Sequence, residues 1–373
     1  MSGLSIVPVR TSAELDRFIR LPERLYAADP SYIAPIRHEC RKALSPRTNP
    51  YFEHAEAQLF LAQRAGRDVG RISAQIDRLA PQPDGHFGFI AAEDDAEVFG
   101  ALFAAAEDWL RAHRRRRAIG PFNLSINEEC GLLVAGFDTP PMMLMAHDAP
   151  YAAQRLEACG YVKAKDTIAY LYDIARDIPR AARRLVDTRR PRTLKVRDLD
   201  PSRYLEEFDL VTAMFNEAWA ANWGFVPFTT AEIRHMAKSL KPLIAPSSVA
   251  IAEIDGKAAG FGVLLPNLNE AIADFGGRLL PFNWLTLYLR LRRGTRTARV
   301  PLMGIRPEYQ GGVLGGLIAF VIIDRLRSAA RARGIQKVEL SWILEDNWPM
   351  RRVIESLGAV PYKTYRLYEK ALA

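Results

Sequence analysis

The residues Arg299–Arg333 read RVPLMGIRPEYQGGVLGGLIAFVIIDRLRSAARAR. The apolar run from Val300 to Ile305 predicts a strand that ends before Arg306-Pro307, and the residues after the glycines predict a long amphipathic helix. Glycine permits positive φ angles and lets another molecule approach the backbone closely. Because the free N–H groups at the start of a helix face the preceding turn, this stretch predicts a cradle for a phosphate or pyrophosphate.

This turn is neither of the two common nucleotide-binding loops. No Lys followed by Ser or Thr comes after the glycines, which excludes a P-loop, and the spacing is not G-x-G-x-x-G. The alternative interpretation is structural: a glycine-rich helix start packed tightly on a sheet.

The turn resembles the motif Gln/Arg-x-x-Gly-x-Gly/Ala, with which the GNAT acyltransferase superfamily holds the pyrophosphate of acyl-CoA. The lead-in Pro307–Tyr309 is also similar, whereas Val313 stands where that family has Gly. The resemblance implies that acyl-CoA contacts this turn and the strand before it, whose backbone N–H groups serve the thioester carbonyl. The residues concerned are Met303, Gly304, Ile305, Gln310, Gly311, Gly312, Val313, Leu314, Gly315 and Gly316.

A second part of the resemblance lies downstream. Val338–Leu344 alternates as a strand and is followed by Asn347, with Gly358 eleven residues later, as in GNAT proteins. Tyr362–Tyr368 then predicts a last strand. The resemblance covers 194–373, and it implies that Asn347 belongs to the acyl-CoA site.

The first half of the chain repeats this order of elements. Asn123–Ile126 parallels Glu339–Trp342, and Pro150–Tyr172 parallels Pro349–Tyr368. We therefore expect an α/β fold with mixed sheets: two tandem GNAT-like domains, at 1–176 and 194–373. Within the first half the pattern predicts a hairpin of 58–64 with 68–77, a helix over 95–113 and a strand over 119–126.

The two predicted domains are not equivalent. Where the second has its glycine turn, the first has Ala91-Ala92-Glu93-Asp94-Asp95. A phosphate would meet carboxylates there, and like charges at close range repel by about 1 kcal/mol or more. We expect the first domain to lack a CoA loop and to wall the acceptor cleft, or to be a plain scaffold.

The composition limits the classes of protein to which the chain can belong. With 373 residues, 49% hydrophobic and 25% charged, the chain predicts two globular domains. No apolar run reaches about 18 residues, and the first ten residues lack the core of a signal peptide, so we expect a cytoplasmic protein. Cys40, Cys130 and Cys159 are widely spaced, which predicts neither a disulfide framework nor a metal site.

Acyl transfer to an amine requires a neutral amine, a polarised carbonyl and a stabilised thiolate. The resemblance implies a Tyr as general acid seven residues after Asn347, but Ile354 stands there. The candidates for the missing base or acid are Glu345, Glu339, Tyr365 and, from the first domain, His54. Each of these residue types is more often structural than catalytic.

A net charge of +8 and a pI near 9.4 favour an acidic partner. Part of the charge follows the apolar-aromatic run that begins at Leu279: Arg290, Arg292, Arg293, Arg296 and Arg299. The run predicts either an ordinary amphipathic helix with a solvated arginine edge or a peripheral contact with anionic membrane at the inner membrane face.

The chain thus resembles the GNAT-like group implicated in bacterial ceramide synthesis, which acylates a sphingoid base or its 3-keto form with long-chain acyl-CoA. That resemblance implies an N-acyltransferase without a tightly bound cofactor, using acyl-CoA or an acyl carrier protein and a lipid amine. The alternatives are a tandem-GNAT transferase that uses aminoacyl-tRNA, disfavoured by the intact glycine turn, and a non-catalytic acyl-CoA-binding protein.

Overall fold

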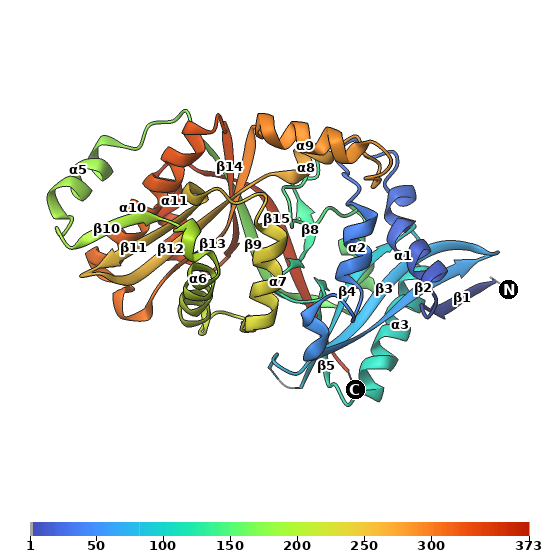
Figure 1. The fold of residues 1–373 in the computed structure, drawn as a ribbon. Helices are drawn as coiled ribbons and strands as arrows, with labels where there is room; N and C mark the ends of the chain where they lie inside the picture. The colour runs from blue at the N-terminus through green and yellow to red at the C-terminus, as the bar shows by residue number, and fades with distance from the viewer. Residues whose placement is uncertain (1–2, 82, 373) are drawn as a thin grey trace. The chain divides into compact units, whose positions relative to one another are not determined.

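The structure is a computed structural model that describes residues 3–81 and 83–372 (Figure 1). It divides into two compact units. The N-terminal unit comprises Met1–Thr167, Ile272–Thr286 and Lys363–Ala373, and the C-terminal unit comprises Ile168–Ala271 and Leu287–Tyr362. This division differs from the predicted ranges in three short segments, 168–176, 272–286 and 363–373. The assignment of 1–176 and 194–373 to two tandem domains stays a prediction.

The first half of the chain supplies most of the N-terminal unit. Its strands β1 to β5 pair in chain order, and β5 and β8 pair with the end of β15. The elements are β1 (Leu4–Pro8), α1 (Ser12–Leu25), α2 (Arg37–Ala43), β2 (Ala55–Arg64), β3 (Arg67–Asp77), β4 (Asp84–Ala92), α3 (Ala96–Ala112), β5 (Arg117–Gly120), β6 (Phe122–Asn123), β7 (Glu129–Cys130), β8 (Leu132–Ala135), α4 (Ala152–Ala158) and β9 (Val162–Asp173).

The second half supplies most of the C-terminal unit. Its sheet has the order β14-β13-β12-β11-β10. The elements are α5 (Arg180–Arg189), β10 (Leu194–Asp198), α6 (Tyr204–Trp219), α7 (Thr230–Leu240), β11 (Val249–Ile254), β12 (Lys257–Pro266), α8 (Leu268–Ile272), α9 (Asn283–Arg293), β13 (Thr297–Ile305), α10 (Gly312–Ala332), β14 (Lys337–Leu344), α11 (Trp348–Ser356) and β15 (Val360–Ala371).

Each unit is built around a β-α-β crossover. In the N-terminal unit α3 connects the parallel strands β4 and β5, and in the C-terminal unit α10 connects β13 and β14. Both helices pack closely on a glycine of their sheet. A Cβ atom at Gly70 would lie 2.7 Å from Leu102 of α3, and one at Gly262 would lie 2.7 Å from Ile322 of α10. The two glycines therefore fix how near each crossover helix lies.

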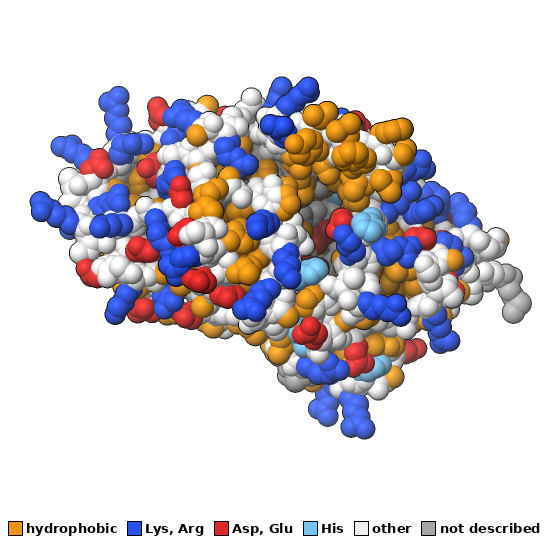
Figure 2. Space-filling model, viewed as in Figure 1, with side chains coloured by type: hydrophobic (Ala, Val, Ile, Leu, Met, Phe, Trp, Pro, Cys, Tyr) orange, Lys and Arg blue, Asp and Glu red, His pale blue; other side chains and the backbone are white. Residues whose placement is uncertain are grey.

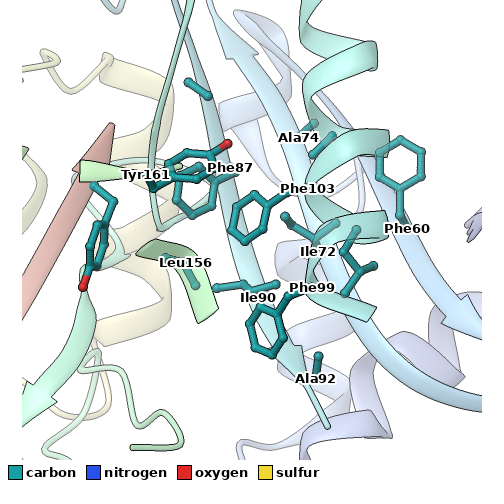
Figure 3. Close-up of a cluster of buried hydrophobic side chains, with 14 of the residues drawn as sticks. Phe60, Ile72, Ala74, Phe87, Ile90, Ala92, Phe99, Phe103, Leu156 and Tyr161 are labelled. Carbon is teal, nitrogen blue, oxygen red and sulfur yellow. The ribbon is translucent and has the colours of Figure 1, made fainter. Parts of the chain in front are cut away.

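The core of the N-terminal unit contains a group of packed aromatic rings among aliphatic side chains (Figure 3). The ring centroid of Phe103 on α3 lies 5.2 Å from that of Phe87 and 4.6 Å from that of Tyr161. All three side chains are almost fully buried. Such ring pairs add about 0.5–1.5 kcal/mol each to the burial of their area, so this cluster anchors α3 on its sheet.

Most predicted elements are confirmed, including the β2–β3 hairpin and the helix over 95–113. The predicted strand over 119–126 is wrong. It is divided into β5 and the two-residue β6, because Pro121 has no N–H with which to continue a ladder. The repeated segments do share their structure: α4 and α11 are each followed by a glycine with positive φ, Gly160 and Gly358, and then by a strand.

One buried carboxylate makes the stability of the N-terminal unit depend on pH. Asp148 is 9% exposed and accepts the N–H of Leu133 at 2.8 Å, and burial raises its pKa to about 7. The unfolded chain releases this proton near pH 3.9, so the folded state binds more protons between pH 4 and 7 and loses stability as the pH rises.

We predict that Asp148→Asn stabilises the chain relative to the parent as the pH is raised from 4 to 8. Asparagine cannot ionise, and its side-chain oxygen can still accept the Leu133 N–H. The full effect is on the order of 4 kcal/mol, at about 1.36 kcal/mol per pKa unit. Urea denaturation at several pH values measures it. Asp138→Asn, at an exposed position, is the matched control, and a pH-independent difference for Asp148→Asn would contradict the prediction.

Candidate active site

A cavity of about 840 Å³ lies within the C-terminal unit. It is bounded by α6, α10, α11, β13, β14 and the end of β9. Its volume falls in the range of small-molecule and cofactor sites, and most of its lining side chains are apolar. The glycine turn that precedes α10 forms part of its wall.

The turn has the geometry that its glycines predict. Gly311 and Gly312 have φ angles of +85° and +57°, and a Cβ atom built on either would meet no atom within 4 Å. Gly315 is different, since its Cβ would lie 2.9 Å from the carbonyl oxygen of Tyr309. The first two glycines therefore give the turn its shape and leave open space above it, while Gly315 lets the helix pack on the turn.

The turn is tied to the strand before it. The side-chain amide of Gln310 donates to the carbonyl of Ile305 at 2.8 Å, and Trp219 Nε1 donates to the carbonyl of Met303 at 3.3 Å. Gly304 completes this stretch of β13, and all five residues line the cavity. Trp219, the last residue of α6, thus ties the strand to that helix.

The strands β13 and β14 separate at the cavity. Their parallel pairing covers Thr297–Val300 with Lys337–Leu340. Beyond it, β13 continues to pair with β12 on its other side, while Pro301–Ile305 and Ser341–Leu344 both border the cavity. The facing strand edges therefore offer backbone N–H and C=O groups to an extended ligand.

A buried polar cluster lies at this separation. Arg299 and Glu339, register partners across β13 and β14, are 1% and 0% exposed and form an ion pair at 3.4 Å. Ser341 accepts from Arg299 Nε at 2.8 Å and donates to Glu339 at 2.6 Å, and Tyr362 donates to the other carboxylate oxygen. Burial and this carboxylate raise the pKa of Tyr362. Glu339 thus reaches the cavity only through Ser341, which lines it.

The turn after β14 carries the remaining predicted polar residues. Asn347 caps α11 by accepting the N–H of Met350 at 3.3 Å, and it lines the cavity together with Asp346. Glu345 is half-buried, and its carbonyl accepts from Arg351 at 2.7 Å. Its neighbours Leu344 and Asp346 line the cavity, and Glu345 is not among the lining residues.

Two residues of the predicted motif point elsewhere. Val313 is 58% exposed, and Leu314 packs against the core of the C-terminal unit, so neither lines the cavity. Gly316 does line it. Val313, at the position where the motif has glycine, therefore does not obstruct the cavity.

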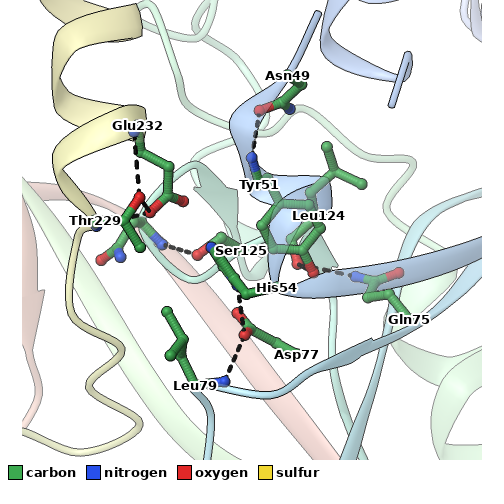
Figure 4. A network of polar contacts seen from close by, with 11 residues as sticks. Asn49, Tyr51, His54, Gln75, Asp77, Leu79, Leu124, Ser125, Thr229 and Glu232 are labelled. Carbon is green, nitrogen blue, oxygen red and sulfur yellow. Dashed lines mark hydrogen bonds and ion pairs between the residues drawn. The ribbon is translucent and has the colours of Figure 1, made fainter. Parts of the chain in front are cut away.

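Two candidate catalytic residues belong to the N-terminal unit. His54 Nδ1 lies 2.9 Å from Asp77, with Tyr51 beside its ring (Figure 4). Tyr365 is fully buried, and its Cβ lies 2.9 Å from the position that a Cβ on Gly131 would take. Both side chains are packed within their own unit, and their catalytic roles stay predictions.

The corresponding helix start of the N-terminal unit is already capped. Asp95 accepts the N–H groups of Glu97 and Val98 at 2.8 and 3.3 Å and pairs with Arg64 at 2.5 Å. Glu93 pairs with Arg24 at 3.0 Å. The donors that hold a ligand phosphate at a helix start are here occupied by a carboxylate of the chain itself.

The helix α9 exposes apolar side chains. Phe282, just before it, is 76% exposed, and Trp284 and Tyr288 are each 52% exposed. Figure 2 shows hydrophobic side chains gathered over this helix, with Lys and Arg side chains nearby. This excludes the interpretation in which these aromatic residues lie inside a domain. Among residues 3–81 and 83–372, no helix is long and apolar enough to cross a bilayer.

One part of the predicted basic segment is wrong. Arg299 does not belong to an exposed set, because it is buried in β13 against Glu339. Arg290 is partly buried and donates to the carbonyl of Ala271 at 2.9 Å. The exposed arginines of this segment are Arg292, Arg293 and Arg296.

Metal chemistry was not expected from the sequence. In the part of the chain that the structure describes, no group of three or more His, Cys, Asp or Glu side chains is placed to hold a metal ion.

Comparison with known proteins supports the fold. No protein-family model matches the chain. The chain is 55% identical over 377 residues to the bacterial ceramide synthase of Caulobacter vibrioides, covering 100% of this chain and 98% of that protein. It is 45% identical over 365 residues to protein YghO of Escherichia coli, covering 96% and 93%.

Solved structures agree with the predicted architecture. A tandem GNAT protein from the clavulanic acid biosynthesis pathway matches 99% of both chains with a TM-score of 0.60 at 16% identity. A GCN5-related N-acetyltransferase from Sphaerobacter thermophilus matches 98% of this chain and 96% of that chain with a TM-score of 0.54 at 12% identity. The chain has the tandem GNAT fold, as the sequence predicted.

We predict that Gly312→Glu weakens CoA binding by about 100-fold or more. The new carboxylate would stand in the open space above the turn, and like charges about 4 Å apart repel by about 4 kcal/mol near a protein surface. Isothermal titration with CoA measures the loss. Gly334→Glu is the matched control, because Gly334 follows the other end of α10, has φ +74° and also faces open space. Equal affinity of the Gly312→Glu variant and the parent would contradict this site.

Proposed function

This chain belongs to the family of the bacterial ceramide synthase, and we propose that it transfers an acyl group from acyl-CoA to the amine of a sphingoid base or its 3-keto form. One observation carries the proposal: the glycine turn opens onto a large apolar cavity between two separated strands. The turn suits a pyrophosphate, and the cavity suits a long acyl chain.

The CoA end of the substrate would be held by backbone groups. The first N–H groups of α10 have no acceptor within the helix, and the helix dipole favours negative charge there. The pantetheine arm carries two amides, which can pair with the free edge of β13 along 301–305 as an added strand does. This arm is common to CoA and to acyl carrier proteins, so either carrier fits this part of the site.

The thioester carbonyl would then lie beside the same strand. A backbone N–H among Met303, Gly304 and Ile305 would polarise the carbonyl oxygen as the amine attacks, and such a donor contributes about 2.7–4 kcal/mol to transition-state stabilisation. Trp219 and Gln310 hold this stretch through the Met303 and Ile305 carbonyls. They position the backbone without contacting the reacting atoms.

We assign the general base to Glu345 in preference to Glu339. Glu339 accepts hydrogen bonds from Ser341 and Tyr362 and pairs with Arg299, so its charge is already satisfied. Both of its carboxylate oxygens therefore already have partners within the buried cluster. Glu345 is half-buried and directly follows Leu344, which lines the cavity.

A direct assay tests the transferase. The purified chain is incubated with palmitoyl-CoA and sphinganine or 3-ketosphinganine, free thiol is followed with a chromogenic reagent, and the N-acylated product is identified by mass spectrometry. Thiol release that depends on the amine, with a product of the expected mass, supports the proposal. Acyl-CoA binding with no turnover on any amine would make the chain a binding protein instead.

We predict that Glu345→Gln lowers kcat by about 10²-fold or more while CoA still binds. The amide cannot accept the proton of the attacking amine, and general bases contribute about 10²–10⁴-fold. Glu206→Gln, the same change at an exposed position of α6 that does not line the cavity, is the control and is expected to stay within a few-fold of the parent. If folded Glu345→Gln and Glu339→Gln variants kept full activity, neither glutamate would be the general base, and the remaining candidates would be His54, Tyr365 and the substrate's own amine.

We also propose that α9 brings the protein to anionic membrane, where a lipid amine resides. The aromatic rings suit the headgroup region, and each arginine near an anionic surface contributes about 1 kcal/mol. Three exposed arginines, Arg292, Arg293 and Arg296, therefore give about 3 kcal/mol. Burial of the apolar side chains beside them in the membrane adds further binding free energy.

We predict that the parent floats with vesicles of anionic lipid more than with neutral vesicles, and less as salt rises, because salt screens the charges. The triple variant Trp284→Ala, Arg292→Glu, Arg293→Glu is expected to lose this binding. Arg183→Glu, Arg184→Glu on α5 makes the same charge change at exposed positions elsewhere and serves as the control. Equal recovery of parent and triple variant on anionic vesicles would exclude α9 as the membrane contact.

A further inference from the structure

The cavity extends from the separated ends of β13 and β14 alongside the part of the two strands that is paired. From Gly312 to Arg327, α10 advances about 22 Å at 1.5 Å per residue, and residues at both ends of this stretch line the cavity. Along the lining face the side chains begin small and become large: Gly312, Gly315, Gly316, Ala319, Ile323 and Leu326. The inner part of the cavity is therefore a narrow apolar extension of the site at the glycine turn.

The walls of this inner extension come from β9, β14 and α11. Val338 and Leu357 are almost fully buried, and Val338 belongs to the paired part of β14, beyond the separation of the strands. Ile354, also buried, lines it from α11. A ligand group here is surrounded by hydrocarbon side chains and is out of reach of the phosphate site.

Arg327 is the residue of α10 that lines the cavity farthest along the helix from the glycine turn. Its guanidinium donates to the hydroxyl of Tyr172 at 3.0 Å, to the carbonyl of Ile174 at 3.3 Å and to the carbonyl of Arg176. The side chain is 6% exposed and lies 3.7 Å from Asp177. Because these partners already engage the guanidinium, Arg327 forms a fixed wall and does not suit the capture of an anion.

We propose that this inner extension holds the distal part of the acyl chain, and that its closure at Arg327 limits the chain length the protein accepts. The inference rests on the proposed function, because it takes acyl-CoA as the ligand of the glycine turn. One acyl chain spans about 15 Å, half of the hydrocarbon core of a bilayer. The phosphate end is fixed at the turn, so the end of the chain is the only part of acyl-CoA that is both apolar and far enough from the turn.

The inference predicts a dependence of affinity on chain length. Each methylene removed from water favours binding by about fourfold, so affinity should rise from acetyl-CoA through octanoyl-CoA to palmitoyl-CoA while the chain fills the extension. It should stop rising once the chain reaches the closed end. A chain that lay on an open surface would show no such limit.

The test measures dissociation constants of acetyl-, octanoyl- and palmitoyl-CoA by isothermal titration, below their micelle concentrations, without an acceptor. In Ala319→Phe, a phenyl ring enters the extension between the turn and Ile323. The ratio of palmitoyl-CoA to acetyl-CoA affinity is expected to fall by about tenfold or more, equivalent to two or more methylenes. Ala332→Phe makes the same change at an exposed position on the last residue of α10 and should leave the ratio unchanged.

A second variant protects the test against a folding defect. Ile323→Ala enlarges the inner extension, so the longest chain that still gains affinity should become longer than in the parent. Equal losses for all three thioesters in Ala319→Phe, or a parent that binds palmitoyl-CoA no tighter than acetyl-CoA, would overturn the inference. The inference would also be overturned if the variants changed only how turnover depends on the chain length of the sphingoid base, because the acceptor chain would then occupy the extension.

These outcomes separate the two proposals. If binding depends on chain length but no amine is acylated, the proposed transferase activity is wrong and the acyl-chain site stands. If an amine is acylated but binding does not depend on chain length, only the proposed acyl-chain site is wrong.

Discussion

The separation of β13 and β14 depends on two neighbouring features of the sequence. Arg299 and Glu339 face each other across the strands as a buried ion pair, and removing one partner of such a pair costs about 3–5 kcal/mol. One residue after the last paired position, Pro301 has no N–H with which to continue the ladder. The ion pair holds the strands in register up to this point, and beyond the proline both strand edges border the cavity.

The two crossover helices show how one architecture gives two different helix starts. In the C-terminal unit, α10 begins after Gly311, which leaves open space in front of the helix dipole. In the N-terminal unit, α3 begins after Asp95, whose carboxylate takes the same place and is neutralised by Arg64. A cap by the chain's own carboxylate stabilises a helix by about 1 kcal/mol, whereas a glycine start leaves its donors for a ligand.

Local chemistry explains which features the sequence could predict. The glycine turn and the hairpin of 58–64 with 68–77 depend on neighbouring residues, and they are found where expected. The burial of Arg299 could not be predicted in this way, because Arg299 ends a run of five arginines of which three are exposed, and its partner Glu339 is forty residues away. The inner extension of the cavity was missed for the same reason, since its walls meet only through tertiary packing.

The side chain at position 354 connects the chemistry with the shape of the cavity. The resemblance to GNAT proteins implies a tyrosine acid there, yet Ile354 is 2% exposed and lines the cavity. A phenol hydroxyl buried in this apolar wall without a partner would cost about 1–3 kcal/mol. An isoleucine instead adds hydrocarbon to the surface that an alkyl chain would contact. The loss of the usual acid therefore follows from the same apolar lining that suits a long-chain substrate, and the departing thiolate must be stabilised by groups elsewhere at the mouth of the cavity.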